Sequence, residues 1–361
     1  MPSPPSNTLD SICVLRLSAI GDVCHAVSTV QAIQRTYPKA KITWIIGKVE
    51  EKLIGDLPGI EFIVFDKSLG WKAYRQLRQS MKNHRFDVLL HMQLAFRANL
   101  AAFFIPAKTK IGFAKNRSKE LHSIFVNQHI SDSRGFHVLD GFRDFARAIG
   151  VDEGLPEWDI PIPHEAKAWA TNFLPKDPFV VISPAASKAE RNWATVRYAA
   201  ISDYCHELGY QVLLTGGPTP FEKQLCADIS KASRAYTINL AGQTNLKQLL
   251  LTLQKAQLVI APDSGPAHMA VTQSTPVIGL YAHSNPSRTG PYLYQRFTAD
   301  AFTALACKEL GVERQQIPWG YRLKGDNLMD AISVEQVKTL IDQAIDFYGL
   351  EQPEAEPLRP E

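Results

Sequence analysis

The chain has few cysteines and no long hydrophobic run, and both shortages exclude classes of protein. Its five cysteines in 361 residues include no C-x-x-C pair, so neither a disulfide framework nor a zinc ribbon is expected. We predict buried, reduced thiols and a reducing compartment. No uncharged apolar run reaches the ~18 residues that a membrane-spanning helix needs. The polar, proline-rich start lacks the basic and apolar regions of a signal peptide.

Several motifs of well-known enzyme classes are also absent. The chain contains no G-x-G, no G-x-x-x-x-G-K-[ST], no G-x-S-x-G and no H-E-x-x-H. These absences argue against four classes of protein: dinucleotide-binding proteins with the usual glycine-rich fingerprint, P-loop nucleoside triphosphatases, serine hydrolases and zinc proteases. No D-x-D occurs, which argues against a nucleotide-sugar site bridged by a metal ion. A net charge of +3 gives no reason to expect nucleic acid as a partner.

Apolar strands alternate regularly with helical patterns along the chain. A first series of strands is predicted at 12–17, 42–46, 62–65, 87–91 and 111–113, and a second at 179–183, 211–215, 237–240, 258–261 and 276–281. Such alternation predicts parallel sheets covered by helices on both faces. The expected fold class is α/β, with two Rossmann-like, doubly wound domains facing a cleft in which ligands bind.

Composition gives the expected domain boundaries. The segment Pro161-Ile162-Pro163 reads as a linker, so the first domain is expected at 11–163 and the second at 164–332. An amphipathic pattern predicts a final helix at 333–350, which we expect to pack back on the first domain. Residues 1–10 are expected to be a flexible N-terminus, and 351–361, rich in proline and glutamate, a disordered tail.

Two stretches about half a chain apart each read as a buried strand, a turn of small residues and the first turn of a helix. Residues 258–268 place Ser264 and Gly265 at a helix start, where free N–H groups and the positive end of the helix dipole form an anion site. Residues 13–22 place the carboxylate of Asp22 at another helix start. A carboxylate in one half and an anion site in the other favour group transfer from a phosphate-bearing donor.

Plainer interpretations of these residues exist. Asp263, Ser264 and His268 could be taken for a hydrolase triad, but Ser264 and His268 lie on one helical turn, which does not suit a base that must reach the serine hydroxyl. Asp263 or Ser264 could instead cap the helix that follows, and Asp22 could cap its own helix.

The chain resembles the heptosyltransferases of lipopolysaccharide core assembly, glycosyltransferase family 9. The resemblance runs from about Ile12 to Tyr292 and is strongest at 17–25, 183–193 and 261–268. Its most specific part is the Asp-Ser/Thr-Gly-x-x-His motif at 263–268. The resemblance implies a GT-B fold, with the acceptor bound mainly by the first domain and the nucleotide sugar mainly by the second. It also implies inverting transfer that needs neither a metal nor a cofactor.

The resemblance, together with the residue types, suggests roles on the donor side. Asp22 is expected to be the catalytic base that takes the acceptor proton. Asp263 is expected to orient the donor sugar or its loop. The donor diphosphate is expected at Ser187, Lys188, Arg191, Ser264, Gly265 and His268, and the nucleotide at Gly216, Glu222 and Gln243. His268 could equally pack without touching phosphate, and Glu222, Lys188 or Arg191 could be solvated surface charges.

The implied acceptor, a Kdo-bearing lipid A, is anionic. The candidate residues for it are basic: Arg75, Arg78, Arg97, Arg117 and Lys119. They could bind carboxylates and phosphates or a cytoplasmic membrane surface. A solvated helix face is the alternative for the first two.

The function that the resemblance implies is transfer of a heptose from ADP-L-glycero-D-manno-heptose to Kdo of the lipopolysaccharide inner core. The enzyme is expected in the cytoplasm, peripheral on the inner membrane. One alternative is the same chemistry with another nucleotide sugar or another glycan acceptor. Another is a nucleotide-sugar-binding protein without catalysis, against which Asp22 argues because a sensor needs no base.

Overall fold

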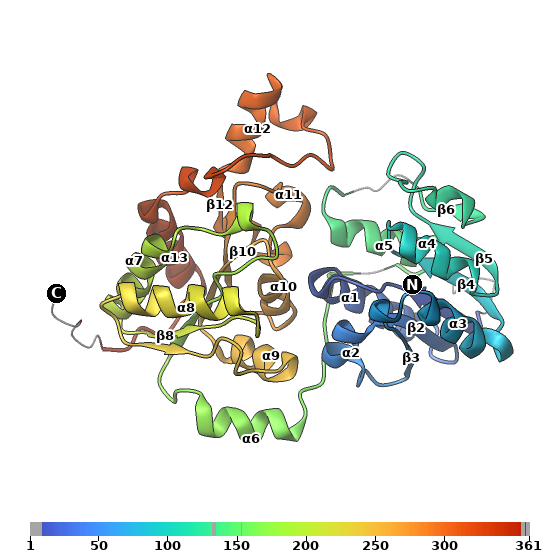
Figure 1. Cartoon of the computed structure of the whole chain (residues 1–361), viewed down its shortest axis with the longest axis horizontal. Helices are drawn as coiled ribbons and strands as arrows, with labels where there is room; N and C mark the ends of the chain where they lie inside the picture. The colour runs from blue at the N-terminus through green and yellow to red at the C-terminus, as the bar shows by residue number, and fades with distance from the viewer. Residues whose placement is uncertain (1–8, 132–134, 153, 355–357, 359–361) are drawn as a thin grey trace. The chain divides into compact units, whose positions relative to one another are not determined.

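The protein is built from two compact units, Met1–Pro161 and Ile162–Glu361. A computed structural model describes residues 9–131, 135–152, 154–354 and 358 (Figure 1). Residues 1–8 of the expected flexible N-terminus lie outside the described residues, and so do 355–357 and 359–361 of the expected disordered tail. Residues 351–354 form neither helix nor strand.

The first unit contains one parallel sheet in the order β3-β2-β1-β4-β5-β6. Its strands are β1 (Ser11–Leu15), β2 (Lys41–Gly47), β3 (Ile60–Phe65), β4 (Phe86–His91), β5 (Ala107–Gly112) and β6 (Gln128–His129). Its helices are α1 (Ile20–Thr36), α2 (Lys48–Ile54), α3 (Trp71–Ser80), α4 (Phe96–Phe103) and α5 (Val138–Ala148), with 3-10 turns η1 (Lys67–Leu69), η2 (Met81–Asn83) and η3 (His122–Ile124).

Helices α3 and α4 cover one face of this sheet. Cys13 and Leu15, alternate residues of β1, share a core cluster with Leu77 of α3 and with the alanines of α4. Their neighbours Ile12 and Val14 point to the opposite face and are also fully buried. Burial on both faces requires two covering layers, which is why the strands read as continuous apolar runs.

The second unit contains a parallel sheet in the order β12-β11-β10-β7-β8-β9. Its strands are β7 (Phe179–Ile182), β8 (Gln211–Leu214), β9 (Thr237–Asn239), β10 (Leu258–Pro262), β11 (Val277–Tyr281) and β12 (Thr298–Asp300). Its helices are α6 (His164–Phe173), α7 (Thr195–Glu207), α8 (Pro220–Ala232), α9 (Leu246–Lys255), α10 (Gly265–Thr272), α11 (Pro286–Thr289), α12 (Phe302–Leu310) and α13 (Val334–Tyr348), with 3-10 turns η4 (Ala189–Arg191), η5 (Tyr292–Phe297), η6 (Arg314–Gln316) and η7 (Leu328–Ala331).

The last helix, α13, packs against α7, β11, β12 and η5 of its own unit. Its expected return to the first domain stays a prediction. Within the described part of the chain, no helix is both long enough and apolar enough to cross a membrane.

Each sheet has the same topology when its strands are counted within the unit. In each sheet the first strand lies between the second and the fourth. Successive strands extend the sheet in one direction up to the third strand and in the opposite direction from the fourth, so the strand order reverses between β1 and β4 and between β7 and β10. Doubly wound sheets bind ligands at the carboxyl ends of strands at such a switch point. The loops after β1 and β4 are therefore the candidate ligand-binding loops of the first unit, and those after β7 and β10 are the candidates in the second.

Candidate active site

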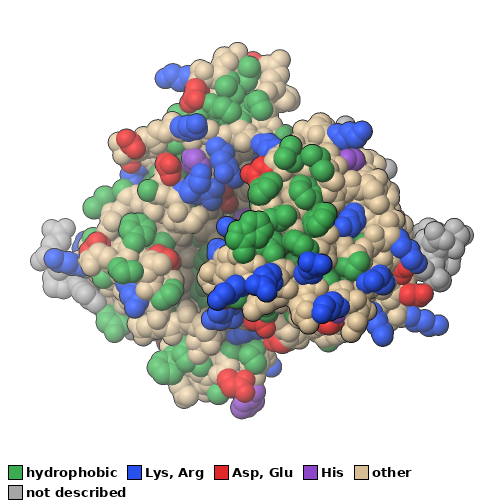
Figure 2. All heavy atoms as spheres, turned by 45° about the vertical axis from the view of Figure 1, so that its right-hand side comes forward, with side chains coloured by type: hydrophobic (Ala, Val, Ile, Leu, Met, Phe, Trp, Pro, Cys, Tyr) green, Lys and Arg blue, Asp and Glu red, His purple; other side chains and the backbone are tan. Residues whose placement is uncertain are grey.

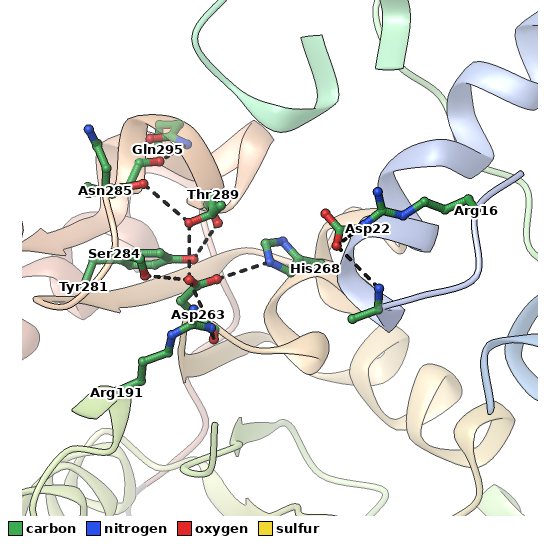
Figure 3. A network of polar contacts seen from close by, with 12 residues as sticks. Arg16, Asp22, Arg191, Asp263, His268, Tyr281, Ser284, Asn285, Thr289 and Gln295 are labelled. Carbon is green, nitrogen blue, oxygen red and sulfur yellow. Dashed lines mark hydrogen bonds and ion pairs between the residues drawn. The ribbon is translucent and has the colours of Figure 1, made fainter. Parts of the chain in front are cut away.

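Asp263 directly follows β10 and is the centre of a buried polar network (Figure 3). Its Oδ2 accepts hydrogen bonds from Ser284 Oγ at 2.5 Å and from Thr289 Oγ1 at 3.3 Å. Arg191 Nη1 donates to the backbone oxygen of Asp263 at 2.9 Å and lies 3.3 Å from Oδ2. His268 Nε2 lies 3.6 Å from Oδ1. One carboxylate thus joins the loops after β7 and β11 to the start of α10.

The charge of Asp263 is stabilised by this network. Burial alone would raise the pKa of Asp263, but its interaction with His268 and the charge of Arg191 outweigh burial and hold the pKa well below the ordinary range. A carboxylate that stays ionised and is occupied by these partners is suited to positioning. The predicted role in orienting the donor or its loop stays a prediction.

Helix α10 begins at Gly265, where the sequence placed it. Ser264 is the N-cap residue, but no side-chain hydrogen bond caps the helix. The alternative that Asp263 or Ser264 serves as its cap is therefore wrong. Ser264 Oγ is buried and has no hydrogen-bond partner within the described residues. The helix start thus combines uncapped N–H groups with an unpaired hydroxyl, which suits an anion.

His283, in the loop after β11, is a residue that sequence reasoning missed. It is 4% exposed, and neither ring nitrogen has a hydrogen-bond partner in the part of the chain described. Burial lowers the pKa of His283, and the nearby charges of Arg191 and Lys188 lower it further. Arg191 Nε is likewise buried without a hydrogen-bond partner among those residues. Unpaired polar atoms beside cations point to an anionic ligand.

The loop after β7 carries the predicted cations and is anchored at its end by Trp193. That indole is 2% exposed, and its Nε1 donates to the backbone oxygen of Ile332 at 3.1 Å. Arg191 is brought to Asp263, as described. Ser187 and Lys188 lie at exposed positions of the same loop.

The loop after β8 holds Gly216 and is shaped by Glu222. The carboxylate of Glu222 accepts from the backbone N–H of Gly217 at 2.5 Å and from Thr219 Oγ1 at 3.0 Å. Glu222 is therefore more than a solvated charge on a surface helix, because it holds the turn that leads into α8. Contact with a ribose stays a prediction.

The loop after β9 contacts the loop after β8. Gly242 N–H donates to the backbone oxygen of Gly216 at 2.9 Å. Gln243 Nε2 donates to the backbone oxygen of Asn239 at 2.7 Å. Gly216 and Gln243, predicted from separate stretches of sequence, thus lie in adjoining loops.

In the first unit, Asp22 lies in the first turn of α1. Its Oδ2 forms an ion pair with Arg16 Nη2 and accepts from the backbone N–H of Ala19 at 3.4 Å (Figure 3). Asp22 therefore caps its own helix in part, through one long hydrogen bond. The side chain is 34% exposed, so its carboxylate can be reached from solvent.

Arg16, which positions Asp22, was also missed. It is buried, its Nη1 donates to the backbone oxygen of Met92 at 2.6 Å, and its guanidinium lies 5.3 Å from the ring centre of Phe142. Met92 follows β4, so Arg16 ties Asp22 to the switch point between β1 and β4. The sequence did contain a signal for this role, because an arginine within the apolar stretch 12–17 needs a buried partner.

The basic residues predicted for the acceptor lie on several elements. Arg75 and Arg78 are exposed on α3, and Arg97 is exposed on α4. A groove of about 700 Å³ lies along the edge strand β3 and is lined in part by Arg75. The remaining two candidates follow β5: Lys119 is exposed, and Arg117 Nη2 donates to the backbone oxygen of Gly135 at 3.4 Å.

Comparison with known proteins relates the chain to one family. The sequence model of glycosyltransferase family 9 (heptosyltransferase) matches residues 74–309. The lipopolysaccharide core heptosyltransferase OpsX of Haemophilus influenzae is 44% identical over 328 residues, which cover 91% of this chain and 94% of that protein. Lipopolysaccharide heptosyltransferase 3 of Escherichia coli is 23% identical over 72% of this chain and 79% of its own.

Solved structures agree in architecture. A glycosyltransferase family 9 protein from Veillonella parvula superposes with a TM-score of 0.77 at 22% identity, covering 94% of this chain and 99% of its own. Heptosyltransferase WaaC of Escherichia coli with ADP gives 0.70 at 18% identity, covering 92% and 99%. These likenesses confirm the α/β fold of GT-B type. Since the family's sequence model spans most of the chain and a relative of high identity nearly all of it, the chain belongs to glycosyltransferase family 9, the heptosyltransferases.

Proposed function

We propose that this enzyme transfers a heptose from ADP-L-glycero-D-manno-heptose to Kdo of the lipopolysaccharide inner core, with inversion. The relative at 44% identity is named a lipopolysaccharide core heptosyltransferase, which supports the transferred sugar and the pathway. The observation that carries the proposal is the uncapped start of α10 beside Arg191, with Ser264 Oγ and the His283 ring buried and unpaired among the described residues. That arrangement suits a diphosphate.

On the donor side, the diphosphate would lie against the N–H groups of Gly265 and the turn that follows it. Arg191 and Lys188 would offset its charge through charge-assisted hydrogen bonds, and the His283 ring would donate a further hydrogen bond to it. Within the described residues, no group of three or more His, Cys, Asp or Glu side chains is placed to hold a metal ion. From the cations and N–H groups at the start of α10, we propose that Arg191, Lys188 and the helix start, rather than a divalent cation, stabilise the leaving ADP.

On the acceptor side, Asp22 would accept the proton of the attacking hydroxyl. The hydroxyl oxygen forms a bond to the anomeric carbon of the heptose as the bond from that carbon to the phosphate oxygen breaks. ADP leaves with the electron pair of the broken bond. A single displacement inverts the configuration at the anomeric carbon, and Arg16 would hold Asp22 in place during it.

The proposed acceptor is Kdo attached to lipid A, at the cytoplasmic face of the inner membrane. Its carboxylates and phosphates need cations, which the first unit offers at Arg97, Arg117 and Lys119, and on α3 at Arg75 and Arg78. Planar guanidinium groups bind carboxylates and phosphates in pairs of hydrogen bonds.

A transfer assay read by mass spectrometry tests the proposal. The full chain is incubated with Kdo-lipid A and a panel of ADP- and UDP-sugars, with and without EDTA. We expect the acceptor to gain one heptose from ADP-heptose alone, at a rate that EDTA does not change. Transfer from another donor only, or binding of ADP-heptose with no product under any condition, would overturn the proposal. Loss in EDTA that Mg²⁺ restores would overturn its metal-free part.

A further inference from the structure

Helix α4 of the first unit is apolar on both sides. Its inward side is made of alanines 98, 101 and 102, which are fully buried in the core. Phe96 and Phe103, seven positions apart and so on one side of the helix, are 53% and 67% exposed. The small side chains therefore face the core and the large aromatic ones face outward.

Helix α3 continues this apolar surface. Trp71 at its start is 72% exposed. Its ring centre lies 5.4 Å from that of Tyr74, which lies 6.2 Å from Phe104, and Phe104 lies 5.3 Å from Phe103. Together with Phe96, these rings form what we call the α3–α4 aromatic surface.

The charges on these two helices are all positive. They carry Lys72, Arg75, Arg78 and Arg97, all exposed, and neither helix contains an aspartate or glutamate. Glu120, from the loop beside α4, accepts from the backbone N–H of Phe96, and its single negative charge leaves the four cations in excess. Figure 2 shows hydrophobic side chains lying next to lysine and arginine side chains on the face turned to the viewer.

This combination fits a lipid surface better than a protein. Aromatic side chains are stabilised at the level of the headgroups, and lysine and arginine are attracted to anionic lipids. In a two-fold contact with a second copy, the same patch would meet itself, and four cations would face four cations. The charge complement of the surface is therefore an anionic one.

We propose that the α3–α4 aromatic surface inserts into the headgroup region of an anionic bilayer and holds the enzyme there. The inference rests on the proposed function in one respect only, because a lipid-linked acceptor requires the enzyme at a membrane. The surface itself is independent of the donor site and of Asp22.

Vesicle flotation tests this without donor or acceptor. The full chain is mixed with vesicles of phosphatidylcholine, or of phosphatidylcholine with phosphatidylglycerol. We expect binding to the second kind, weakened by salt. The double variant Trp71→Ser, Phe103→Ser should bind about tenfold or more weakly, because its interfacial aromatic groups are lost. The matched control is Phe173→Ser, Tyr236→Ser, which removes rings of 59% and 67% exposure from the second unit and should change nothing.

Two further readings separate the possible outcomes. The double variant should keep its melting temperature and its turnover of detergent-solubilised acceptor, so that lost vesicle binding reports on the surface and not on folding or catalysis. Brominated lipid should quench the tryptophan fluorescence of the wild type but less that of Trp71→Phe, since Trp71 is 72% exposed whereas the other five tryptophans are buried (Trp44, Trp193) or partly buried (Trp158, Trp169, Trp319). Equal vesicle binding by wild type and double variant, or no binding by the wild type, would overturn the proposal. Self-association that the double variant abolishes would also overturn it and assign the surface to a second copy.

Discussion

At the scale of single residues, the best indication of the ligand comes from buried polar atoms that have no hydrogen-bond partner. Around Asp263 every oxygen of the carboxylate has a partner, whereas the His283 ring and Ser264 Oγ have none in the described chain. The hydrogen bonds around Asp263 are therefore complete without a ligand. The His283 ring and Ser264 Oγ are typical of groups that gain their partner when a ligand binds.

His283→Leu is expected to weaken the binding of ADP about 10- to 150-fold, because a hydrogen bond to a charged phosphate contributes roughly 1.5–3 kcal/mol. Leucine keeps the apolar volume and removes the donor. Calorimetric titration with ADP measures the effect, and donor KM should rise more than kcat falls. His283→Gln, which keeps a donor, should recover part of the affinity. Wild-type affinity in His283→Leu would exclude the ring from the donor site.

The sequence could indicate which residue types gather at the site but not all of its members. Ser264 and Gly265 were placed at a helix start because small residues after an apolar run are typical of one. His283 was not found, because its significance depends on burial beside residues far away in sequence. Arg16 interrupts an apolar stretch, but its backbone partner Met92 lies far along the chain and could not be identified. The orphaned ring of His283 in particular depends on Arg191 and Lys188, about ninety positions earlier.

At the scale of elements, a pair of buried histidines joins β4, α4 and η3. His91 Nε2 and His122 Nδ1 each lie 2.9 Å from Asn99 Oδ1, and Phe113 N–H donates to His122 Nε2 at 3.1 Å. Both rings therefore donate to one amide oxygen while neutral. Burial lowers the pKa of His122 to about 4 and that of His91 well below its ordinary value.

This network predicts a loss of stability in mild acid. Both histidines bind protons more readily in the unfolded chain, where the pKa is about 6.5, than in the folded one. Their stabilising effect is complete above that pH and is lost as the pH falls from about 6.5 toward the folded pKa of His122, about 4. Each unit of pKa difference corresponds to about 1.4 kcal/mol. Unfolding midpoints in urea, measured across this range, should fall steadily.

The matched variants separate this network from general acid effects. His122→Gln should be less stable near neutral pH, because it disturbs the network, and should show a flatter pH dependence. His164→Gln, at an exposed position in the second unit, should keep the wild-type slope. An equal slope in wild type and His122→Gln would contradict the assignment.

Elements with an unbroken apolar pattern were predictable, and those with polar residues at buried or edge positions were not. Strand β5 begins at Ala107, earlier than the predicted 111–113, because Lys108 and Lys110 interrupt its pattern. Lys110 is accommodated through its Nζ, which donates to the backbone oxygen of Ala102 at 2.7 Å. Helix α5 was missed although Leu139 and Phe142 recur at helical spacing on its buried side.

For the whole molecule, the two units repeat one topology, and the groups proposed for the reaction are divided between them. The proposed base lies after β1 in the first unit, and the proposed diphosphate site lies after β7 and β10 in the second. Two series of alternating strands and helices sufficed to predict two doubly wound sheets, because parallel strands covered on both faces leave a strong apolar signal. The GT-B architecture was implied by family resemblance and not by that signal.

Because the proposed reacting groups belong to different units, we predict that donor and acceptor together compact the protein. Closure would also exclude water and limit hydrolysis of the donor. Small-angle scattering of the free protein, of the protein with ADP, and of the protein with donor and an acceptor analogue measures this. The radius of gyration should be smallest in the third sample. An unchanged radius, together with an unchanged distance between labels on the two units, would contradict closure.

The central claim, that Asp22 is the base for transfer from a donor held at α10, is tested most directly by Asp22→Asn. Asparagine keeps an oxygen that can accept from the N–H of Ala19, so the start of α1 is preserved while the base is lost. Single-turnover transfer of heptose to Kdo-lipid A should fall ~10²–10⁴-fold, while binding of ADP and the melting temperature stay at wild-type values. A folded Asp22→Asn enzyme with near wild-type turnover would contradict the claim.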